Sequence, residues 1–307
     1  MAVSAASGTP QYSGTWIPEI WSGNMLIKFY EACVLAAISN TDYEGEIKKQ
    51  GDKVIISQVA DITISDYDKN SDLNIQRPEA ANVELLIDKA KYFNFICDNI
   101  DEYQTHLPLM ERWSDDAGEQ MSITVDTAVL ADVYADAHAS NKGTAAGAIS
   151  GDIDFGAAGS PVVVTPSDIT EKIVDCKVAL GEQNVPKKGR YGVIPEWMSG
   201  MVMKSELKDA SLAGDGTSIM RNGRIGVIAN FELYESNLLT NATDGAYTAF
   251  HALFGQKHAI SFAAQMTEMD NLKSERTFGR LIRGLKVYGY KVLKAQALID
   301  LYCAKGS

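Results

Sequence analysis

The chain has 307 residues, 46% hydrophobic and 22% charged, which is typical of a globular protein with room for one large domain or two. Its 28 basic residues are outnumbered by 40 acidic ones, and the formal net charge of −12 disfavours sequence-specific binding to nucleic acid. The same charge is compatible with the wall of a container that must not adhere to nucleic acid. No apolar run reaches the roughly 18–20 residues that span a bilayer, so the sequence does not predict an integral membrane protein.

No secretory signal is visible at the N-terminus, which lacks a basic n-region and an apolar h-region. The four cysteines lie far apart and form no Cys-x-x-Cys pair, which argues against a zinc ribbon or a disulfide scaffold. They are Cys33, Cys97, Cys176 and Cys303. We therefore expect the chain to fold in a reducing cytosol.

Residues 1–24 are rich in Ser, Ala, Gly, Thr and Pro and contain a single charge, so they cannot bury enough apolar surface to fold alone. We expect an extended arm that docks through its few large apolar side chains. These are Trp16, Ile17, Ile20 and Trp21. The stretch MLIKFYEACVLAAI, from Met25 to Ile38, has few charges and predicts a short helix buried on most sides.

Two segments between Gly51 and Asp101 alternate with period 2 and predict a long β-hairpin. The alternating apolar residues are Val54, Ile56, Ile62 and Ile64 on the outgoing side and Val83, Leu85 and Ile87 on the returning side. The intervening SDYDKNSDLNIQRPEAAN is too long for a tight turn. We therefore expect the hairpin to project from the body with a charged tip.

The segment from His106 to Ser140 predicts the longest helix of the chain. Its apolar side chains recur at helical spacing and form one stripe. The stripe consists of Met121, Val125, Val129 and Val133, widened by Ile123, Leu130, Tyr134 and Ala137. A helix that begins near Leu109 would have about 31 residues and a length of roughly 46 Å. Asp126, Asp132 and Asp136 fall between the apolar positions, and we assign them to the solvated face.

Residues 139–160 are small and glycine-rich, which predicts a flexible crossing between two parts of the fold. The stretch TPSDITEKIVDCKVALGEQNV then predicts a helix with Ser167 as its N-cap and Gly181 at its end. GRYGVIPEWMSGMVMKS predicts a short buried strand, Tyr191–Ile194, which Pro195 stops before a helix begins.

The stretch RIGVIANFELYESNLL predicts a second strand in this part of the chain. AYTAFHALFGQKHAISFAAQM holds helix-like and strand-like pieces that periodicity does not separate. RLIRGLKVYGYKVLKAQALIDLYCA predicts a closing strand followed by a strand or a short helix. Helices and antiparallel strands thus interleave irregularly, and the predicted fold class is α+β.

No motif for catalysis or metal binding is present. The glycines of residues 221–226 precede a strand and no lysine follows them, so they predict a turn and not a phosphate-binding loop. The histidines form no H-E-x-x-H motif, and we predict structural or surface roles for His106, His138, His251 and His258. The basic tetrad KKGR (187–190) predicts a solvated turn, with a salt bridge to another subunit as the alternative. The sequence therefore predicts no enzyme, no cofactor and no metal.

The order of these segments makes the chain resemble the major capsid proteins of tailed double-stranded-DNA bacteriophages, of the Hong Kong 97 type. IPEIWSGNMLIKFYEACVLAAI is similar to the entry of the N-terminal arm, and Gly51–Asp101, with its V-x-L-x-I-D-x-x-K-Y-F-x-F return strand, is similar to the extended loop. GRYGVIPEWMSGMVMKSELKDAS, RNGRIGVIANFELYESNLL and GLKVYGYKVLKAQALIDL are similar to the axial domain and the return to the peripheral domain. Nearly the whole chain is covered.

The resemblance implies a division of the chain into five parts. It implies an N-terminal arm and short helix (1–40), an extended β-hairpin loop (41–102), a peripheral domain with a spine helix (103–160), an axial domain (161–275) and return strands (276–307).

The resemblance also implies a coat protein that self-assembles into pentamers and hexamers of an icosahedral shell around phage DNA. Assembly would take place in the host bacterial cytoplasm, by way of a procapsid, with a separate scaffolding protein and a portal. Decoration proteins are an optional addition, packaged DNA would be contacted non-specifically, and no membrane is involved. Two alternatives stay open: an encapsulin-like compartment shell and a cytosolic enzyme with an unrecognised site.

Three groups of residues are candidates for contacts between subunits. The charges of the projecting loop are suited to intersubunit pairs: Asp66, Asp68, Lys69, Asp72 and Arg77. The polar tip of the axial domain would lie near a symmetry axis, with Asp215, Arg221 and Arg224. Docking of the arm would depend on Trp16 and Trp21.

Overall fold

The computed structural model describes residues 31, 33–42, 53–57, 59–60, 62–69, 72, 74–79, 82–98, 109–205, 227–274 and 279–306. The α-helices are α1 (Leu35–Ile38), α4 (Leu109–Val133), α5 (Ile169–Glu182) and α6 (Glu196–Lys204), and the 3-10 turns are η1 (Tyr134–Asp136), η2 (Ala139–Asn141) and η5 (Ala295–Ala297). The strands are β1 (Lys53–Ser57), β2 (Asn82–Leu86), β3 (Lys89–Asp98), β4 (Val162–Val164), β5 (Arg190–Ile194), β6 (Val227–Ile228), β7 (Phe231–Glu235), β8 (Asn241–Asp244), β9 (Tyr247–Gln256), β10 (Ile260–Lys273), β11 (Gly279–Val292) and β12 (Leu298–Lys305). The predicted α+β class is confirmed.

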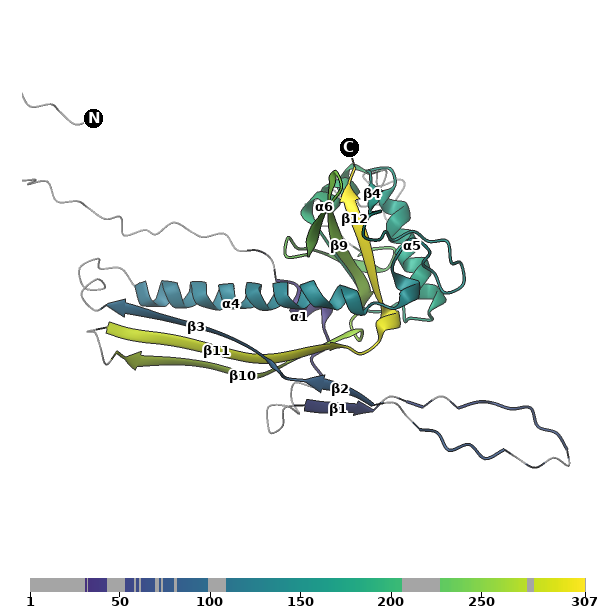
Figure 1. Cartoon of the computed structure of the whole chain (residues 1–307), viewed down its shortest axis with the longest axis horizontal. Helices are drawn as coiled ribbons and strands as arrows, with labels where there is room; N and C mark the ends of the chain where they lie inside the picture. Colours follow the sequence, from purple (N-terminus) through teal and green to yellow (C-terminus); the bar gives the residue numbers. More distant parts are fainter. Residues whose placement is uncertain are drawn as a thin grey trace, which may run out of the picture.

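A seven-stranded mixed sheet forms the centre of one end of the molecule, with α5 and α6 beside it (Figure 1). Its strand order is β4-β12-β9-β5-β7-β6, and β8 also pairs with β9. β12 is parallel to β4 and antiparallel to β9, whereas β5 is parallel to β7 and antiparallel to β9. Every residue of β5 is buried, because both faces of this central strand are covered.

A three-stranded antiparallel sheet, β10-β11-β3, extends away from that end, and α4 lies along it (Figure 1). β10 and β11 pair over nearly their whole length, with one irregularity between Ala264 and Met266. The boundary expected at residue 275 therefore falls between two strands of one sheet. One continuous hydrophobic core joins α1, α4, α5, α6 and both sheets.

The predicted hairpin forms, as β1 and β2, and projects below the three-stranded sheet (Figure 1). Val54 pairs with Leu85 and Ile56 with Val83, so the alternating residues share one face. That face packs on Ala263 and Val287 of the sheet. The root of the hairpin is thus held by its apolar side.

The spine helix α4 has 25 residues, which corresponds to about 37 Å. It is shorter than predicted because Tyr134–Asp136 tighten into a 3-10 turn and Ala137 is extended, with φ −60° and ψ 143°. The apolar stripe is confirmed, since Val125, Val129 and Val133 are all buried.

The assignment of Asp126 to the solvated face is wrong. Its side chain lies against the start of α1, and the residue is only 5% exposed. Its Oδ2 accepts the backbone N–H groups of Val34, at 2.7 Å, and Leu35, at 3.0 Å. A carboxylate can be buried there because these donors partly replace water.

Part of the glycine-rich stretch 139–160, predicted as a crossing, packs against the body of the subunit, whereas residues 148–152 are exposed. Ala146 and Phe155 are fully buried. Asn141 donates from Nδ2 to the carbonyl oxygens of Gln296 and Leu298, at 2.7 and 3.0 Å. At Gly156, where φ is +78°, a Cβ atom would lie 2.2 Å from the carbonyl oxygen of Tyr302. The small residues therefore allow close packing against β12.

The helix predicted after residue 165 is confirmed as α5, but its ends differ from the prediction. Its N-cap is Asp168, one residue after the predicted Ser167, and the Asp168 side chain makes no capping hydrogen bond to the helix. The helix continues past Gly181 to Glu182, and Asn184 then adopts the left-handed φ of 57°.

The strand expected over RIGVIANFELYESNLL is instead a pair of strands, β6 and β7. Ala229 and Asn230 form the turn with φ of 50° and 70°, values typical of a tight hairpin. The stretch that periodicity could not separate is also two strands, β9 and β10. Among the described residues, no helix is long and apolar enough to cross a membrane.

Candidate intersubunit surfaces

The projecting loop beyond the β1–β2 ladder is the most exposed part of the described chain. The ladder ends where Ser57 pairs with Asn82. Farther out, Thr63 donates its N–H to Oε1 of Gln76 at 3.0 Å, and Gln76 Nε2 donates to the Thr63 carbonyl oxygen at 2.6 Å. These two bonds link the outgoing and returning sides, so the loop keeps a ribbon-like form without a continuous ladder.

The structure places all five predicted charged residues on this loop, and all five are exposed. They are Asp66, Asp68, Lys69, Asp72 and Arg77. None of them forms an ion pair within the part of the chain that the structure describes. Their charges are therefore available to an external partner.

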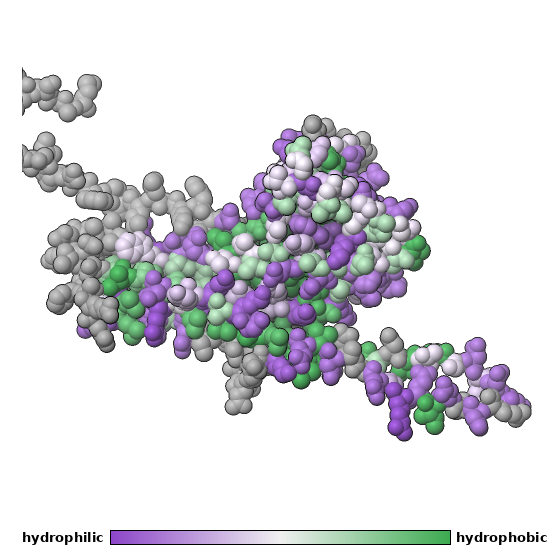
Figure 2. Space-filling model, viewed as in Figure 1, coloured by the Kyte–Doolittle hydropathy of each residue, from purple (hydrophilic) through white to green (hydrophobic). Residues whose placement is uncertain are grey.

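The loop also exposes large apolar side chains, which were not predicted from the sequence to form a surface. The exposed fractions are 97% for Val59, 65% for Ile62, 89% for Ile64, 74% for Tyr67 and 87% for Ile75. Apolar and hydrophilic side chains lie next to one another along the loop (Figure 2). Five large apolar side chains exposed on one short loop are a candidate interaction surface.

The root of the loop is fixed by a polar cluster of Lys89, Asp132 and Tyr290. Lys89 Nζ donates to the Tyr290 hydroxyl at 2.8 Å and to Asp132 at 3.3 Å, and the Tyr290 hydroxyl donates to Asp132. The hydrogen bond that Tyr290 donates lowers the pKa of Asp132, and the hydrogen bond that Lys89 donates to Tyr290 raises the pKa of Lys89, so both groups stay charged at neutral pH. The cluster joins β3, α4 and β11 at the point where the loop begins.

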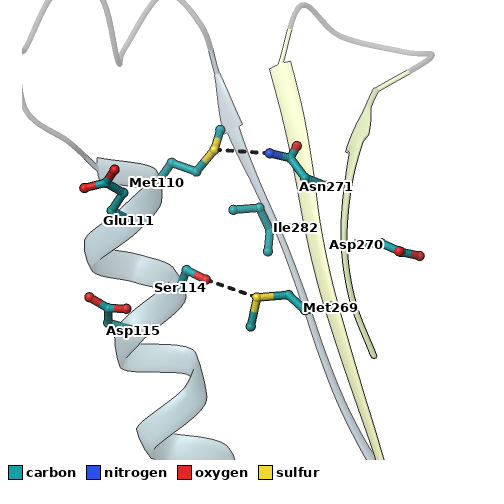
Figure 3. A pocket seen from close by; sticks show the side chains of 8 residues that line it. All are labelled: Met110, Glu111, Ser114, Asp115, Met269, Asp270, Asn271 and Ile282. Carbon is teal, nitrogen blue, oxygen red and sulfur yellow. Dashed lines mark hydrogen bonds between the residues drawn. The ribbon is translucent and has the colours of Figure 1, made fainter. Parts of the chain in front are cut away.

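A second surface lies between the first turns of α4 and the outer ends of β10 and β11, around a cavity of about 540 Å³. Met110, Ser114 and Met269 point into it, with Ile282 between them, whereas Glu111 and Asp115 point away (Figure 3). Ser114 Oγ donates to the sulfur of Met269 at 3.5 Å. This lining suits an apolar side chain and provides no paired nucleophile and base.

The histidines that the structure describes make structural contacts. His251 bonds to Asp300, His258 bonds to Asn40 and His138 caps η2. His106 lies outside the described residues. Within the described chain, no group of three or more His, Cys, Asp or Glu side chains is placed to hold a metal ion.

The basic tetrad at 187–190 is solvated only in part. Lys187 and Lys188 are exposed, but Arg190 is 2% exposed, so the expectation for this residue is wrong. Its guanidinium donates to the carbonyl oxygens of Val185 at 2.7 Å, Pro186 at 3.0 Å and Lys177 at 3.4 Å. It therefore ties the end of α5 to β5 and is not available to another subunit.

The other predicted contact residues lie outside the described residues. They are Trp16, Trp21, Asp215, Arg221 and Arg224.

Comparison with known proteins identifies the family. The family model described as "Phage capsid protein" matches residues 100–301, more than half of the chain. A chain of Mycobacterium phage Che8 is similar to this one with a TM-score of 0.73 and 26% identity, over 93% of this chain and 97% of that chain. A chain from the capsid structure of cyanophage P-SCSP1u matches with a TM-score of 0.72 and 18% identity, over 95% and 94% of the two chains. Comparison with curated protein sequences finds no match.

These findings do not favour the encapsulin-like compartment or the cytosolic enzyme. The capsid of a native GTA particle shows the same fold, with a TM-score of 0.62 and 15% identity over 97% of this chain and 96% of that one. A fold shared with phage capsids over nearly the full length, together with the family match, indicates a non-enzymatic structural protein that assembles with itself. The chain belongs to the phage capsid protein family, and it is a major capsid protein with the Hong Kong 97-type fold, a component of the virion shell.

Proposed function

We propose that the projecting loop, residues 59–79, lies over a neighbouring copy of the chain and joins subunits into pentamers and hexamers of an icosahedral shell. The observation that supports this is the exposure of five large apolar side chains on a ribbon that its own subunit does not cover. Such heterologous contacts close into rings when the rotation between subunits permits. Many contacts together then stabilise the shell through multivalency.

The apolar side chains provide more of the contact energy than the charges do. Covering one large aliphatic side chain is worth about 1.5–3 kcal/mol. An exposed ion pair is worth only about 0–1 kcal/mol. We therefore assign affinity to Ile64 and Ile75 and orientation to Asp66, Asp68, Lys69, Asp72 and Arg77. The small energy of each ion pair would let a misplaced subunit dissociate and rebind.

The remaining parts of the subunit fit the same scheme. We assign the seven-stranded sheet to an axial domain, whose tip carries Asp215, Arg221 and Arg224 near a symmetry axis. Trp16 and Trp21 would dock the arm. The shell would enclose double-stranded DNA and contact it non-specifically, which agrees with the net charge of −12. A separate scaffolding protein, a portal and optional decoration proteins would act with it in the host bacterial cytoplasm.

The loop proposal is tested by replacing its apolar and its charged residues separately. The double variant Ile64→Ser/Ile75→Ser should reduce the yield of shells at least tenfold, measured by sedimentation and negative-stain microscopy, while circular dichroism of the subunit stays unchanged. Ile149→Ser is the matched control, since Ile149 is 81% exposed but lies away from the loop. Wild-type shell yield from the double variant, or an equal loss from the control, would contradict the proposal.

Variants of the charged residues are the second part of that experiment. Neutralising Asp66, Lys69 and Arg77 together should slow assembly and reduce its salt dependence, because fewer charges are left for salt to screen, with a smaller loss of yield than the apolar variant. Charge reversal at Arg221 and Arg224 tests the axial assignment, because unchanged yields of capsomers and shells would exclude these arginines from the contact.

A further inference from the structure

The segment from Cys33 to Asn40 enters the body of the subunit between α4 and β10. Val34, Leu35 and Ile38 are buried in the main core. The backbone of Asn40 bonds on both sides to β10, donating to the Ile260 carbonyl oxygen at 2.8 Å and accepting from Phe262 N–H at 3.0 Å. The segment is therefore fixed at its end by backbone pairing and along its length by apolar contacts.

The start of the segment is held differently, by Asp126. Helix α1 has four residues and no side-chain cap of its own. The N–H groups of Val34 and Leu35 at its start have no partner within the helix. Asp126, 92 and 91 positions later, accepts both of them with one oxygen. This carboxylate thus caps α1 from a different helix.

Burial and the neighbouring groups act on the pKa of Asp126 in opposite directions. Burial raises the pKa of Asp126, whereas the two N–H groups, Lys286 and the Cys33 thiol oppose that shift. Burial also raises the pKa of Cys33 to about 11, so the thiol stays a neutral donor. Without this carboxylate, the N–H groups of Val34 and Leu35 would be buried donors without a partner.

We propose that Asp126 is the positioning residue that anchors the start of this segment and so holds the place where the chain enters the body at residues 33–40. In this role the spine helix fixes the point from which the predicted N-terminal arm begins. The contact is made within one subunit, so it does not depend on the loop reaching a neighbour.

The test is hydrogen exchange measured by mass spectrometry on the full-length subunit. Asp126→Asn keeps the shape of the side chain but replaces one acceptor with a donor, and Asp126→Ala removes both oxygens. We expect amide exchange in residues 33–40 to become about 10- to 100-fold faster in both variants, because the protection depends on hydrogen bonds to a charged acceptor.

Two controls separate positioning from general loss of stability. Asp136→Asn changes an exposed carboxylate just beyond the same helix and should leave exchange in residues 33–40 unchanged. Val129→Ala removes buried methyl groups from α4 and should lower the unfolding midpoint while residues 33–40 stay protected below it. The proposal is overturned if amide exchange in residues 33–40 stays at the wild-type rate in both Asp126 variants. It is also overturned if Val129→Ala speeds amide exchange in residues 33–40 as much as Asp126→Asn does at equal global stability. Shell yield does not enter this measurement, so failure of the loop proposal would be recognised separately.

Discussion

Nδ1 of His251 lies 2.9 and 3.0 Å from the two carboxylate oxygens of Asp300, across adjacent strands of the seven-stranded sheet. The pair is largely buried, with side chains 16% and 10% exposed. Tyr134 of η1 stacks on the imidazole at a centroid distance of 3.8 Å. This contact therefore joins the sheet to the end of the spine helix.

Replacing Asp300 with alanine should destabilise the subunit by about 3 kcal/mol, because the imidazole would lose its buried partner. The free energy of unfolding in urea is the measurement. Asp152→Ala, at an exposed position, should stay within about 0.5 kcal/mol of wild type. Equal stability of the two variants would show that the His251–Asp300 pair does not hold this junction.

Arg190→Lys should cost about 2 kcal/mol although the charge is retained. A lysine ammonium cannot reproduce the planar set of donors that reaches three carbonyl oxygens around Arg190. Urea unfolding of Arg190→Lys and of Lys188→Ala provides the comparison, since Lys188 is an exposed neighbour in the same turn. A lysine variant as stable as wild type would argue that the fork geometry is unimportant.

Gly289 and Gly118 should respond in opposite directions to substitution by alanine. At Gly289 a Cβ atom would lie 2.0 Å from the carbonyl oxygen of Leu86, at the root of the projecting loop. We expect Gly289→Ala to lose about 1–3 kcal/mol and to reduce shell yield. At Gly118 in α4 a Cβ atom would meet nothing within 4 Å, so Gly118→Ala should gain up to about 1 kcal/mol. Thermal unfolding of the two variants is the measurement. A change in stability of the same sign for both variants would contradict the packing argument.

Glu182 should make a contribution to stability that disappears at acidic pH. The Ile149 N–H donates to its carboxylate at 2.9 Å and lowers its pKa below the ordinary value of 4.5. The stabilisation is therefore present above pH 4.5 and is lost as pH falls through the lower folded-state pKa. Since Glu182 is at the surface, we expect less than about 1 kcal/mol. Urea unfolding between pH 7 and pH 3 should show a flatter profile for Glu182→Gln, and parallel profiles would contradict the assignment.

Features with a local pattern were predictable from the sequence. The stripe of Val125, Val129 and Val133 predicted α4, and the alternation around Val54 and Leu85 predicted the hairpin. The end of α4 was placed too late, because helical spacing continues into η1 while the backbone tightens. β9 and β10 could not be distinguished from helix, since the end of β9 and the start of β10 are buried on both faces and lose their alternation there.

Features that depend on distant partners were not predictable in this way. In the sequence, Asp126 has the spacing of a residue on the solvated face of the helix. Its burial is explained only by the first turn of α1, about 90 positions earlier. Arg190 sits in a basic tetrad that looks solvated, yet its acceptors are main-chain oxygens with no sequence signature. The apolar residues of the loop were visible as an alternation, but exposure of Ile64 follows from the lack of a covering layer, which a local pattern does not report.

Because α4 is long, a small rotation at one end moves its other end by a larger distance. Because its 25 residues form one uninterrupted helix, a rotation of roughly 5° about η1 would displace the end near Leu109 by about 3 Å, from a rise of about 1.5 Å per residue. That displacement approaches the width of an atom. Small adjustments where the spine meets the seven-stranded sheet would thus produce larger displacements at the end of the helix near Leu109.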